Sequence, residues 1–374
     1  MPEQLKNFFD RRVVESIAGD LARVHKPFDR AAFVRECLDG LDRLELTGRG
    51  WHIAEAMRRH LPERYEEAAG ILVKSLGPEL GGLSGMEPFK YLPHVFYVAK
   101  YGIDHLDLSM RAQYELTKRF SAEASIRPFI AKDPERTFAV LREWTSDPNA
   151  HVRRLVSEGT RLRLPWAMRV AWLDANPERV LALLDLLKDD PTTLVRRSVA
   201  NNLNDLGKVH RDLLVRTCAA WLDGASPERR ALVEHALRSA VKRGERDALK
   251  LLGYGQRASV AIEDCRLAPR KVAIGGSVSL SFVLRSTSAS PQDVLVDFAV
   301  HFVKANGRAA PKVFKLKRIA LPARGRVPLR ARISLAVHTT RKPRPGTHAV
   351  DVRVNGVAKR AGSFVVTLAE RSPC

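Results

Sequence analysis

The stretch DPNAHVRRLVSEGTRLRLPW, from Asp147 to Trp166, is followed 43 residues later by DPTTLVRRSVANNLND, from Asp190 to Asp205. Both copies space their apolar residues as a helix does, and a period of about 43 residues is typical of HEAT-type helical pairs. In each copy Asp-Pro predicts a helix start, because Asp can cap free N–H groups and Pro suits the first turn. The chain is therefore expected to contain an α-solenoid of HEAT-like repeats.

A Val-Arg-Arg triplet lies at the same place in both copies, so stacked repeats would align four arginines in a row: Arg153, Arg154, Arg196 and Arg197. One interpretation is structural, with one arginine of each pair solvated and the other paired with a neighbouring carboxylate. Acids and amides also follow each triplet, which is unlike a plain packing seam. These features together predict a concave, polar and partly cationic groove.

The rest of residues 1–255 also follows a helical pattern, with apolar residues spaced by three and four and separated by Pro and Gly turns. We expect this region to form the helical repeat domain. Aromatic residues cluster in PFKYLPHVFYVAKYGIDH, from Pro88 to His105. At helical spacing most of them are expected to be core residues rather than stacking platforms for bases.

Strict alternation replaces the helical pattern in residues 265–374. It is found in SVSLSFVLR (277–285), DVLVDFAVHF (293–302), RVPLRARISLAV (326–337) and HAVDVRV (348–354). Runs of period two separated by Gly-containing turns predict an antiparallel immunoglobulin-like β-sandwich. Asn355-Gly356 is the strongest hairpin signal in the chain. The fold class is thus α then β, with a helical solenoid followed by the sandwich.

Positive charge is concentrated in this second domain. The chain carries a formal net charge of +21, and the segment from Cys265 to Cys374 holds 21 Lys and Arg against four acids. A small domain with so few acids favours a polyanionic partner, and a nucleic-acid backbone is the commonest one. A membrane surface is disfavoured, because no basic amphipathic helix is expected.

Several classes of protein are excluded by missing signals. The four cysteines are far apart without a CxxC or Cys/His cluster, so neither a disulfide scaffold nor a metal site is expected. No phosphate-binding Gly-rich loop, HExxH or GxSxG motif is found. No apolar run could span a bilayer and the start is unlike a secretory signal, so we expect a soluble cytoplasmic protein of bacterial type that needs no cofactor.

The motifs RRLVSEGTRLRLPW (153–166), VRRSVANNLND (195–205) and SAEASIRPF (121–129) together resemble one family. They are similar to the AlkC branch of the HEAT-like-repeat DNA glycosylases that repair alkylated bases, a branch related to AlkD. Some members of that branch carry an appended immunoglobulin-like domain. The resemblance covers residues 1–250, and the Trp-and-Asp arrangement of the AlkD branch is not found.

The resemblance implies hydrolysis of the N-glycosidic bond of a cationic alkylpurine such as 3-methyladenine, without a closed pocket for the base. A cationic base leaves as a neutral molecule, so the barrier lies in the positive charge that develops on the sugar and in the placing of water. Carboxylates suit both tasks. We expect Glu158 and Asp205 to act at the sugar and the water, with Glu123 as a third member. Structural alternatives are that Glu158 pairs with Arg161 or Arg197 and that Asp205 caps its helix.

The partner implied is double-stranded DNA that contains alkylated bases, bound by a single chain associated with the nucleoid. Candidate DNA contacts in the repeats are Arg154, Arg161, Arg163, Arg197, Asn201 and Trp166, the last of which could stack or merely pack. Candidate phosphate contacts in the sandwich include Lys315, Lys317, Arg318, Arg341, Lys342 and Arg344.

Two other functions are compatible with the repeats and the charge. The first is a non-catalytic scaffold that binds DNA or an acidic protein, and only the acid cluster and the family motifs argue against it. The second is an RNA-binding module, but no RNP-like or KH-like signature is found.

Overall fold

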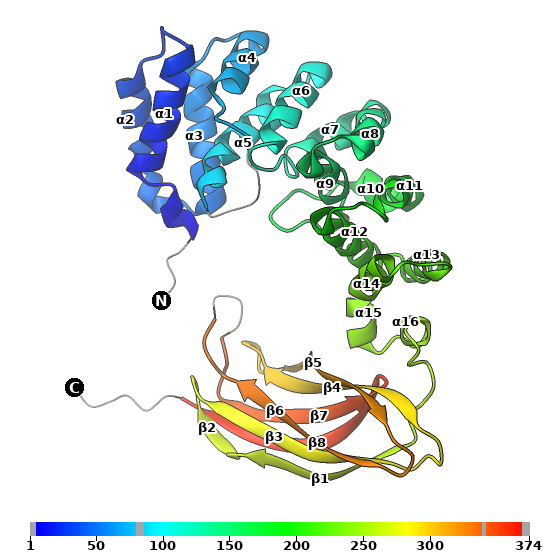
Figure 1. Cartoon of the computed structure of the whole chain (residues 1–374). Coiled ribbons are helices and arrows are strands. Elements are labelled where there is room, and N and C mark those ends of the chain that lie inside the picture. Colours follow the sequence, from blue (N-terminus) through cyan, green and yellow to red (C-terminus); the bar gives the residue numbers. More distant parts are fainter. Residues whose placement is uncertain (1–4, 80–85, 339–341, 369–374) are drawn as a thin grey trace, which may run out of the picture. The chain divides into compact units, whose positions relative to one another are not determined.

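The structure of the chain is a computed structural model that describes residues 5–79, 86–338 and 342–368. Helices come first and strands follow (Figure 1). The α-helices are α1 (Arg11–Val24), α2 (Arg30–Leu38), α3 (Leu46–His60), α4 (Tyr65–Ser75), α5 (Leu92–Tyr101), α6 (Leu106–Thr117), α7 (Ile126–Lys132), α8 (Pro134–Glu143), α9 (Ala150–Gly159), α10 (Ala171–Ala175), α11 (Pro177–Leu187), α12 (Thr193–Leu206), α13 (Arg211–Leu222), α14 (Pro227–Ala236), α15 (Arg238–Arg243) and α16 (Arg246–Leu251). Short 3-10 helices are η1 (Leu5–Phe8), η2 (Leu41–Arg43), η3 (Glu87–Tyr91) and η4 (Trp144–Ser146).

The chain divides into two compact units. The first consists of Met1–Leu214 and Trp221–Ala236, and the second of Val215–Ala220 and Leu237–Cys374. The first unit therefore holds the helical repeats, and the second contains the strands together with α15 and α16. The first strand begins at Val260, ahead of the boundary expected at Cys265.

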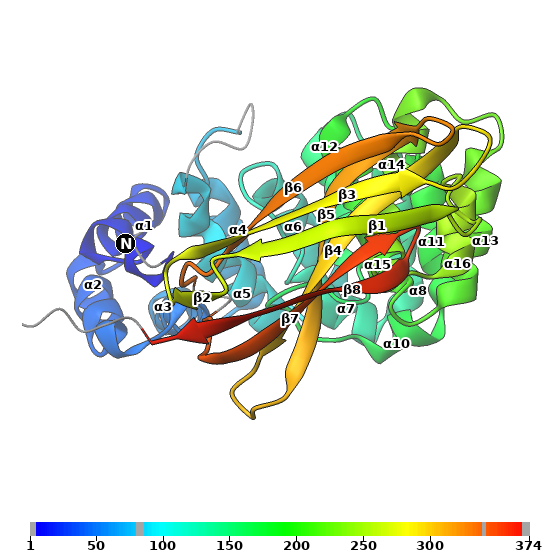
Figure 2. The ribbon, with the colours of Figure 1, turned by 90° about the horizontal axis from the view of Figure 1, so that it is seen from below.

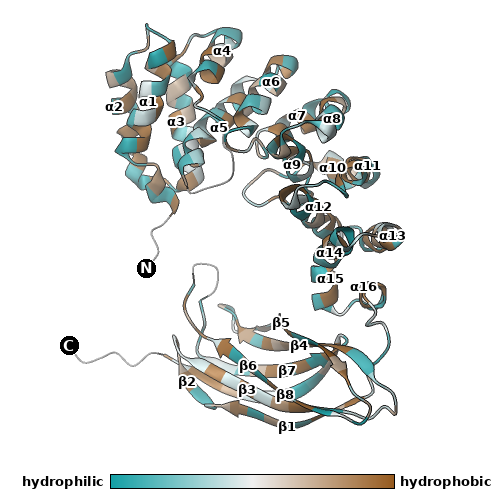
Figure 3. Cartoon of the chain, in the orientation of Figure 1, coloured by the Kyte–Doolittle hydropathy of each residue, from teal (hydrophilic) through white to brown (hydrophobic). Residues whose placement is uncertain are grey.

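Helix α1 is amphipathic and buries one stripe of side chains against its neighbours. In α1 the residues Val14, Ile17 and Leu21 are buried at the three- and four-residue spacing that defines one helical face. Figure 3 shows hydrophobic and hydrophilic residues side by side on the helices. The aromatic-rich segment behaves as expected, because Tyr91, Phe96 and Tyr97 are core residues.

The predicted helix starts at the two repeated Asp-Pro pairs were wrong. Helix α9 begins two residues after Pro148, with Asn149 as its N-cap, and the Asp147 carboxylate instead accepts the N–H of Asn149 at 2.7 Å. Asp190 likewise accepts the N–H of Thr192 at 2.8 Å, ahead of α12. In both copies the Asp side chain closes a local turn two residues ahead, a geometry that competes with helix capping. The Asp-Pro pair at Asp133 does begin a helix, α8.

The second unit contains a β-sandwich. Its strands are β1 (Val260–Ala268), β2 (Lys271–Ala273), β3 (Ser277–Ser286), β4 (Gln292–Val303), β5 (Ala309–Leu321), β6 (Arg326–Ser334), β7 (Gly346–Val354) and β8 (Val357–Thr367). They form a three-stranded sheet in the order β1-β3-β6 and a five-stranded sheet in the order β2-β8-β7-β4-β5. Figure 2 shows the first sheet lying across the second.

The alternating residues of these strands form the core between the two sheets, as predicted. Val278, Leu280, Phe282 and Leu284 of β3 are all buried, whereas Ser279 between them is exposed. The Asn355-Gly356 hairpin is confirmed, since Val354 pairs directly with Val357 and both turn residues have positive φ. One pairing departs from the antiparallel expectation, because β2 runs parallel to β8.

Candidate active site and nucleic-acid interface

Helices α9 and α12 carry the two principal candidate carboxylates and pack side by side (Figure 1). Glu158 lies in the last turn of α9 and Asp205 in the last turn of α12. Glu158 is 5% exposed and Asp205 is 1% exposed. Charged groups at this depth are stable only when they are paired and hydrogen-bonded, so the partners of these carboxylates define the site.

Arg161 joins the two carboxylates. Its Nε donates to Asp205 Oδ2 at 2.8 Å, and its Nη1 makes a short hydrogen bond to Glu158 Oε1. Burial favours the neutral form of the Arg161 guanidinium, but the charges of Glu158 and Asp205 outweigh burial and raise its pKa above the ordinary value. Arg161 therefore stays cationic between two anions. It is also the partner that the structural alternative assigned to Glu158.

The remaining oxygen of each carboxylate is held as well. Ser198 Oγ donates to Glu158 Oε2 at 2.5 Å, and Lys208 Nζ donates to Asp205 Oδ1 at 2.6 Å. Both carboxylates are thus fixed from two sides. Asp205 closes an ion-pair network rather than serving only as a helix cap.

Glu123 joins the same network through Arg154. It lies in the turn before α7, where its Oε2 accepts from Ser121 Oγ at 2.9 Å and from Arg154 Nη2 at 3.1 Å. The same Arg154 nitrogen is 3.9 Å from Glu158 Oε2. The structure therefore brings together all three carboxylates that the sequence singled out, from three successive segments of the repeats.

Three other candidate DNA contacts lie nearby with partners of their own. Arg163 Nη1 donates to the Asp174 carboxylate oxygens at 2.7 and 3.1 Å. Arg197 Nη1 lies 3.0 Å from His235 Nδ1, and the other ring nitrogen of His235 lies 3.1 Å from Asn201 Oδ1. His235 was not foreseen as a member of this surface, and nothing in its local sequence marks it.

Trp166 is displayed to solvent by the loop between α9 and α10. It is 77% exposed and has a φ of 59°, in the left-handed region that bulky residues rarely adopt. A core role for this tryptophan is excluded by its exposure. Backbone strain of this kind gathers at functional positions, which makes Trp166 a candidate for contact with a ligand.

Arg127 is a site residue whose role the sequence did not reveal. This arginine of α7 is 1% exposed, and it donates to the carbonyl oxygens of Gly159 at 2.8 Å, Arg161 at 2.8 Å and Met168 at 2.7 Å. Burial lowers the pKa of Arg127 to about 10. The guanidinium thus ties both ends of the loop that carries Arg161 and Trp166 to the preceding repeat.

The first arginine of each Val-Arg-Arg triplet has a structural role. Arg153 Nε donates to Asp190 Oδ2 at 2.5 Å, and Arg153 Nη1 donates to the carbonyl oxygen of Asp147 at 2.7 Å. Arg196 Nη1 makes the equivalent bond to the carbonyl oxygen of Asp190. These arginines pin the turns that precede α9 and α12, so the second arginine of each triplet is the one that belongs to the candidate site.

In the sandwich, the candidate phosphate contacts are surface residues. Lys315, Lys317 and Arg318 are exposed on β5, which is an edge strand of the five-stranded sheet. Lys342 and Arg344 are exposed in the segment before β7. Arg341 lies outside the described residues.

Within the described ranges, no group of three or more His, Cys, Asp or Glu side chains is placed to hold a metal ion. Over the same part of the chain, the helices are too short or too polar to span a bilayer.

Comparisons with known proteins identify the family to which the chain belongs. A family model described as a DNA alkylation repair enzyme matches residues 120–243, and one described as the C-terminal Ig-like domain of the uncharacterised protein YhaZ matches residues 261–368. The uncharacterized protein YhaZ of Bacillus subtilis is 33% identical over 363 residues, which cover 97% of this chain and 99% of that protein.

A solved structure extends the similarity to the whole fold. It is the Pseudomonas fluorescens alkylpurine DNA glycosylase AlkC bound to DNA containing an abasic site analog, which is 38% identical with a TM-score of 0.90 and covers 98% of this chain and 100% of that one. The chain therefore belongs to the AlkC-type branch of the HEAT-like-repeat DNA alkylation repair glycosylases, in the form that carries a C-terminal immunoglobulin-like domain. The family and the fold class inferred from the sequence are both confirmed.

Proposed function

We propose that this protein is a monofunctional DNA glycosylase of base excision repair that hydrolyses the N-glycosidic bond of cationic alkylated bases such as 3-methyladenine. The observation that carries the proposal is the network of Glu123, Glu158 and Asp205, which three successive segments bring together around two arginines. A scaffold needs no such cluster, because burying ion pairs contributes little to stability compared with apolar packing.

The chemistry follows from the charge of the substrate. An alkylated cationic base departs as a neutral molecule and needs no general acid. Positive charge then develops on the sugar, where a fixed carboxylate stabilises it, while a second carboxylate orients the attacking water. We assign these two tasks to Glu158 and Asp205, with Glu123 as the third anion at the same sugar. A lesion with a stable glycosidic bond, such as hypoxanthine, is a poor substrate on this mechanism.

The surroundings of the carboxylates supply the DNA contacts. The proposed set in the repeats is Arg154, Arg163, Arg197 and Asn201, with Trp166 stacking at the distorted lesion. Arg161 is the exception among the expected contacts, because its guanidinium is hydrogen-bonded to two carboxylates, Glu158 and Asp205, whereas Arg154 and Arg163 are each hydrogen-bonded to one. One chain suffices for the reaction.

In the sandwich we propose that Lys315, Lys317, Arg318, Lys342 and Arg344 contact phosphates. Each phosphate contact contributes about 0.9 to the slope of log affinity against log salt. Replacing Lys315 and Lys317 together by Gln should therefore lower the slope by about 1.8 if each holds one phosphate. An unchanged slope would show that Lys315 and Lys317 of β5 do not contact DNA phosphates.

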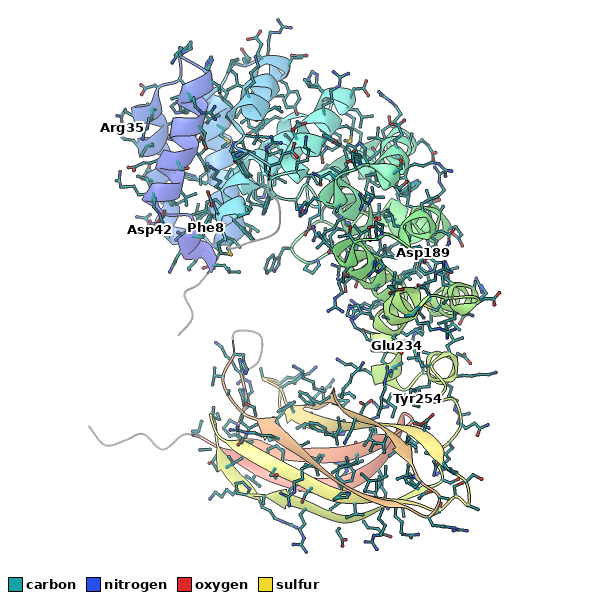
Figure 4. All side chains as sticks on the ribbon, in the orientation of Figure 1. Phe8, Arg35, Asp42, Asp189, Glu234 and Tyr254 are labelled. Carbon is teal, nitrogen blue, oxygen red and sulfur yellow. The ribbon has the colours of Figure 1, made fainter. Side chains whose placement is uncertain are left out.

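The test of the function is release of 3-methyladenine from methylated DNA by the full chain and by Glu158→Gln and Asp205→Asn. The matched control is Asp189→Asn, which removes an exposed carboxylate that pairs with Arg229 in the same repeats (Figure 4). Release by the parent and the control, with loss in both site variants while duplex binding persists, supports the proposal. No release by the parent, despite salt-sensitive binding, would favour the scaffold function.

A further inference from the structure

The interface between α9 and α12, called the seam below, contains polar side chains that the reaction itself does not use. Ser198, Asn202 and Asp205 are spaced by four and three residues, which places them on one face of α12. Their exposures are 2%, 0% and 1%. This face therefore buries two neutral polar groups beside a candidate catalytic carboxylate.

The preceding repeat fills the equivalent positions in another way. Counting back one period of 43 residues, Ser198 and Asn202 of α12 correspond to Leu155 and Gly159 of α9. Leu155 is a buried core residue. Apolar packing is thus an available solution for this position of the repeat, and the polar seam of α12 is a departure from it.

Ser198 sets the orientation of the Glu158 carboxylate. Its hydroxyl donates to Oε2, while Arg161 binds Oε1 from the following loop. With one donor on each oxygen, and each donor on a different element, rotation of the carboxylate about its own axis is blocked.

Asn202 fixes the backbone on which Glu158 stands. Its Nδ2 donates to the Ser157 carbonyl oxygen at 2.8 Å and to Thr160 Oγ1 at 3.0 Å, so it grips the residues on both sides of Glu158. Asn202 Oδ1 and Ser157 Oγ remain buried without a hydrogen-bond partner. Unsatisfied polar atoms cost stability, so stability alone does not account for this seam.

We propose that Ser198 and Asn202 are positioning residues that hold Glu158 at a fixed place and orientation relative to Asp205. This inference rests on the proposed glycosylase function. It assigns to α12 two roles, since one helix carries Asp205 and also orients the carboxylate of the neighbouring helix.

The experiment uses the full chain with Ser198→Ala, Ser198→Thr and Asn202→Leu, and with Ser109→Ala as the control. Ser109 is a fully buried serine whose hydroxyl hydrogen-bonds to Tyr65 and to the Gly102 carbonyl and to none of the candidate carboxylates. The measurements are the single-turnover rate of 3-methyladenine release, the Kd for a duplex with an abasic-site analogue, and the melting temperature.

Ser198→Ala and Asn202→Leu should lower the single-turnover rate on the order of 10- to 100-fold, because a charge-assisted hydrogen bond or a small displacement of a reacting group is worth that much. The Kd should stay within about twofold, and Ser198→Thr, which keeps the hydroxyl, should recover most of the rate. Ser109→Ala should lower the melting temperature at least as much as Ser198→Ala without slowing the reaction.

Three results would overturn the inference, and they are distinguishable. If Glu158→Gln is inactive while Ser198→Ala keeps the parental rate, the glycosylase function stands and the positioning role fails. If the parent itself releases no base, the proposed function fails, and the positioning role fails with it. A melting temperature lowered equally in all variants with rates unchanged would show the seam to be structural only.

Discussion

Replacing Arg161 by Met tests whether this residue serves the carboxylates or the DNA. The substitution keeps a long unbranched side chain but removes the charge between Glu158 and Asp205. Removing one partner of a buried ion pair costs about 3–5 kcal/mol in free energy of unfolding. Lys208 and Ser198 still bind one oxygen of each carboxylate, so we expect the lower end, about 3 kcal/mol.

The assay is urea unfolding of the full chain followed by far-ultraviolet circular dichroism, which reports the helices. Arg179→Met is the control, since Arg179 pairs with Glu135 on the surface and such pairs contribute about 1 kcal/mol at most. Adding Glu158→Gln and Asp205→Asn to Arg161→Met should recover part of the loss, because no unpaired buried charge is then left.

DNA binding supplies the result that would refute this reasoning. If Arg161 held a phosphate, its removal would lower the slope of log affinity against log salt by about 0.9. We expect the slope to be unchanged. A loss of stability below about 1 kcal/mol together with a reduced slope would assign Arg161 to the DNA backbone instead.

Three further predictions concern the stability of the helical repeats. Gly159→Ala should lower the free energy of unfolding by about 1–3 kcal/mol, because the added Cβ would lie 2.6 Å from the buried Ile126 Cγ2. Gly70→Ala should raise it by about 0.5–1 kcal/mol, because its Cβ would meet no atom within 4 Å. Both changes are measured by urea titration. Burial, followed by the nearby Lys90 charge, lowers the pKa of His94 to about 3. His94 therefore stays neutral in the folded state at pH values where the unfolded chain, with a pKa near 6.5, is protonated. The free energy of unfolding should therefore fall by up to about 1.4 kcal/mol for each unit by which the pH is lowered from 6.5 towards 3. His94→Leu should remove this dependence in melting curves. Asp190→Asn should lower the free energy of unfolding by about 3 kcal/mol at pH 7. Burial opposes ionisation of Asp190, but its hydrogen bonds with Arg153 and Thr192 lower its pKa overall. The stability that Asp190 contributes is therefore present above about pH 4 and is lost as the pH falls through the folded pKa, so the effect of the substitution should vanish in acid.

Periodicity explains why so much of the architecture could be predicted. Alternating residues such as Val278, Leu280 and Phe282 can bury one face only as a strand, and turn chemistry at Asn355-Gly356 leaves one hairpin register. The 43-residue repeat likewise places Glu158 and Asp205 on neighbouring helices. These inferences depend on spacing along the chain, which a sequence displays directly.

The partners within the site depend on the path of a loop, which spacing does not specify. Arg161 reaches two carboxylates only because the chain turns back after α9, and that turn is held by Arg127 from the preceding repeat. The repeated Asp-Pro pairs failed as helix starts for a similar reason. Asp147 satisfies a backbone N–H two residues ahead and delays the helix, whereas Asp133 caps one directly, and only the three-dimensional surroundings distinguish the two cases.

The charge balance of the network bears on how a repair enzyme of this kind would select its substrate. Each carboxylate of the network is matched by one cation, the pairs being Glu123 with Arg154, Glu158 with Arg161, and Asp205 with Lys208. Three unpaired carboxylates would repel the DNA backbone, whereas a network without net charge permits a phosphate to approach. The oriented carboxylate oxygens still stabilise positive charge at short range, where it develops on the sugar of a cationic nucleotide. On the proposed mechanism an undamaged nucleotide gains little from this site, because its neutral base does not leave, so selectivity comes from the bond that breaks rather than from a pocket that recognises the base.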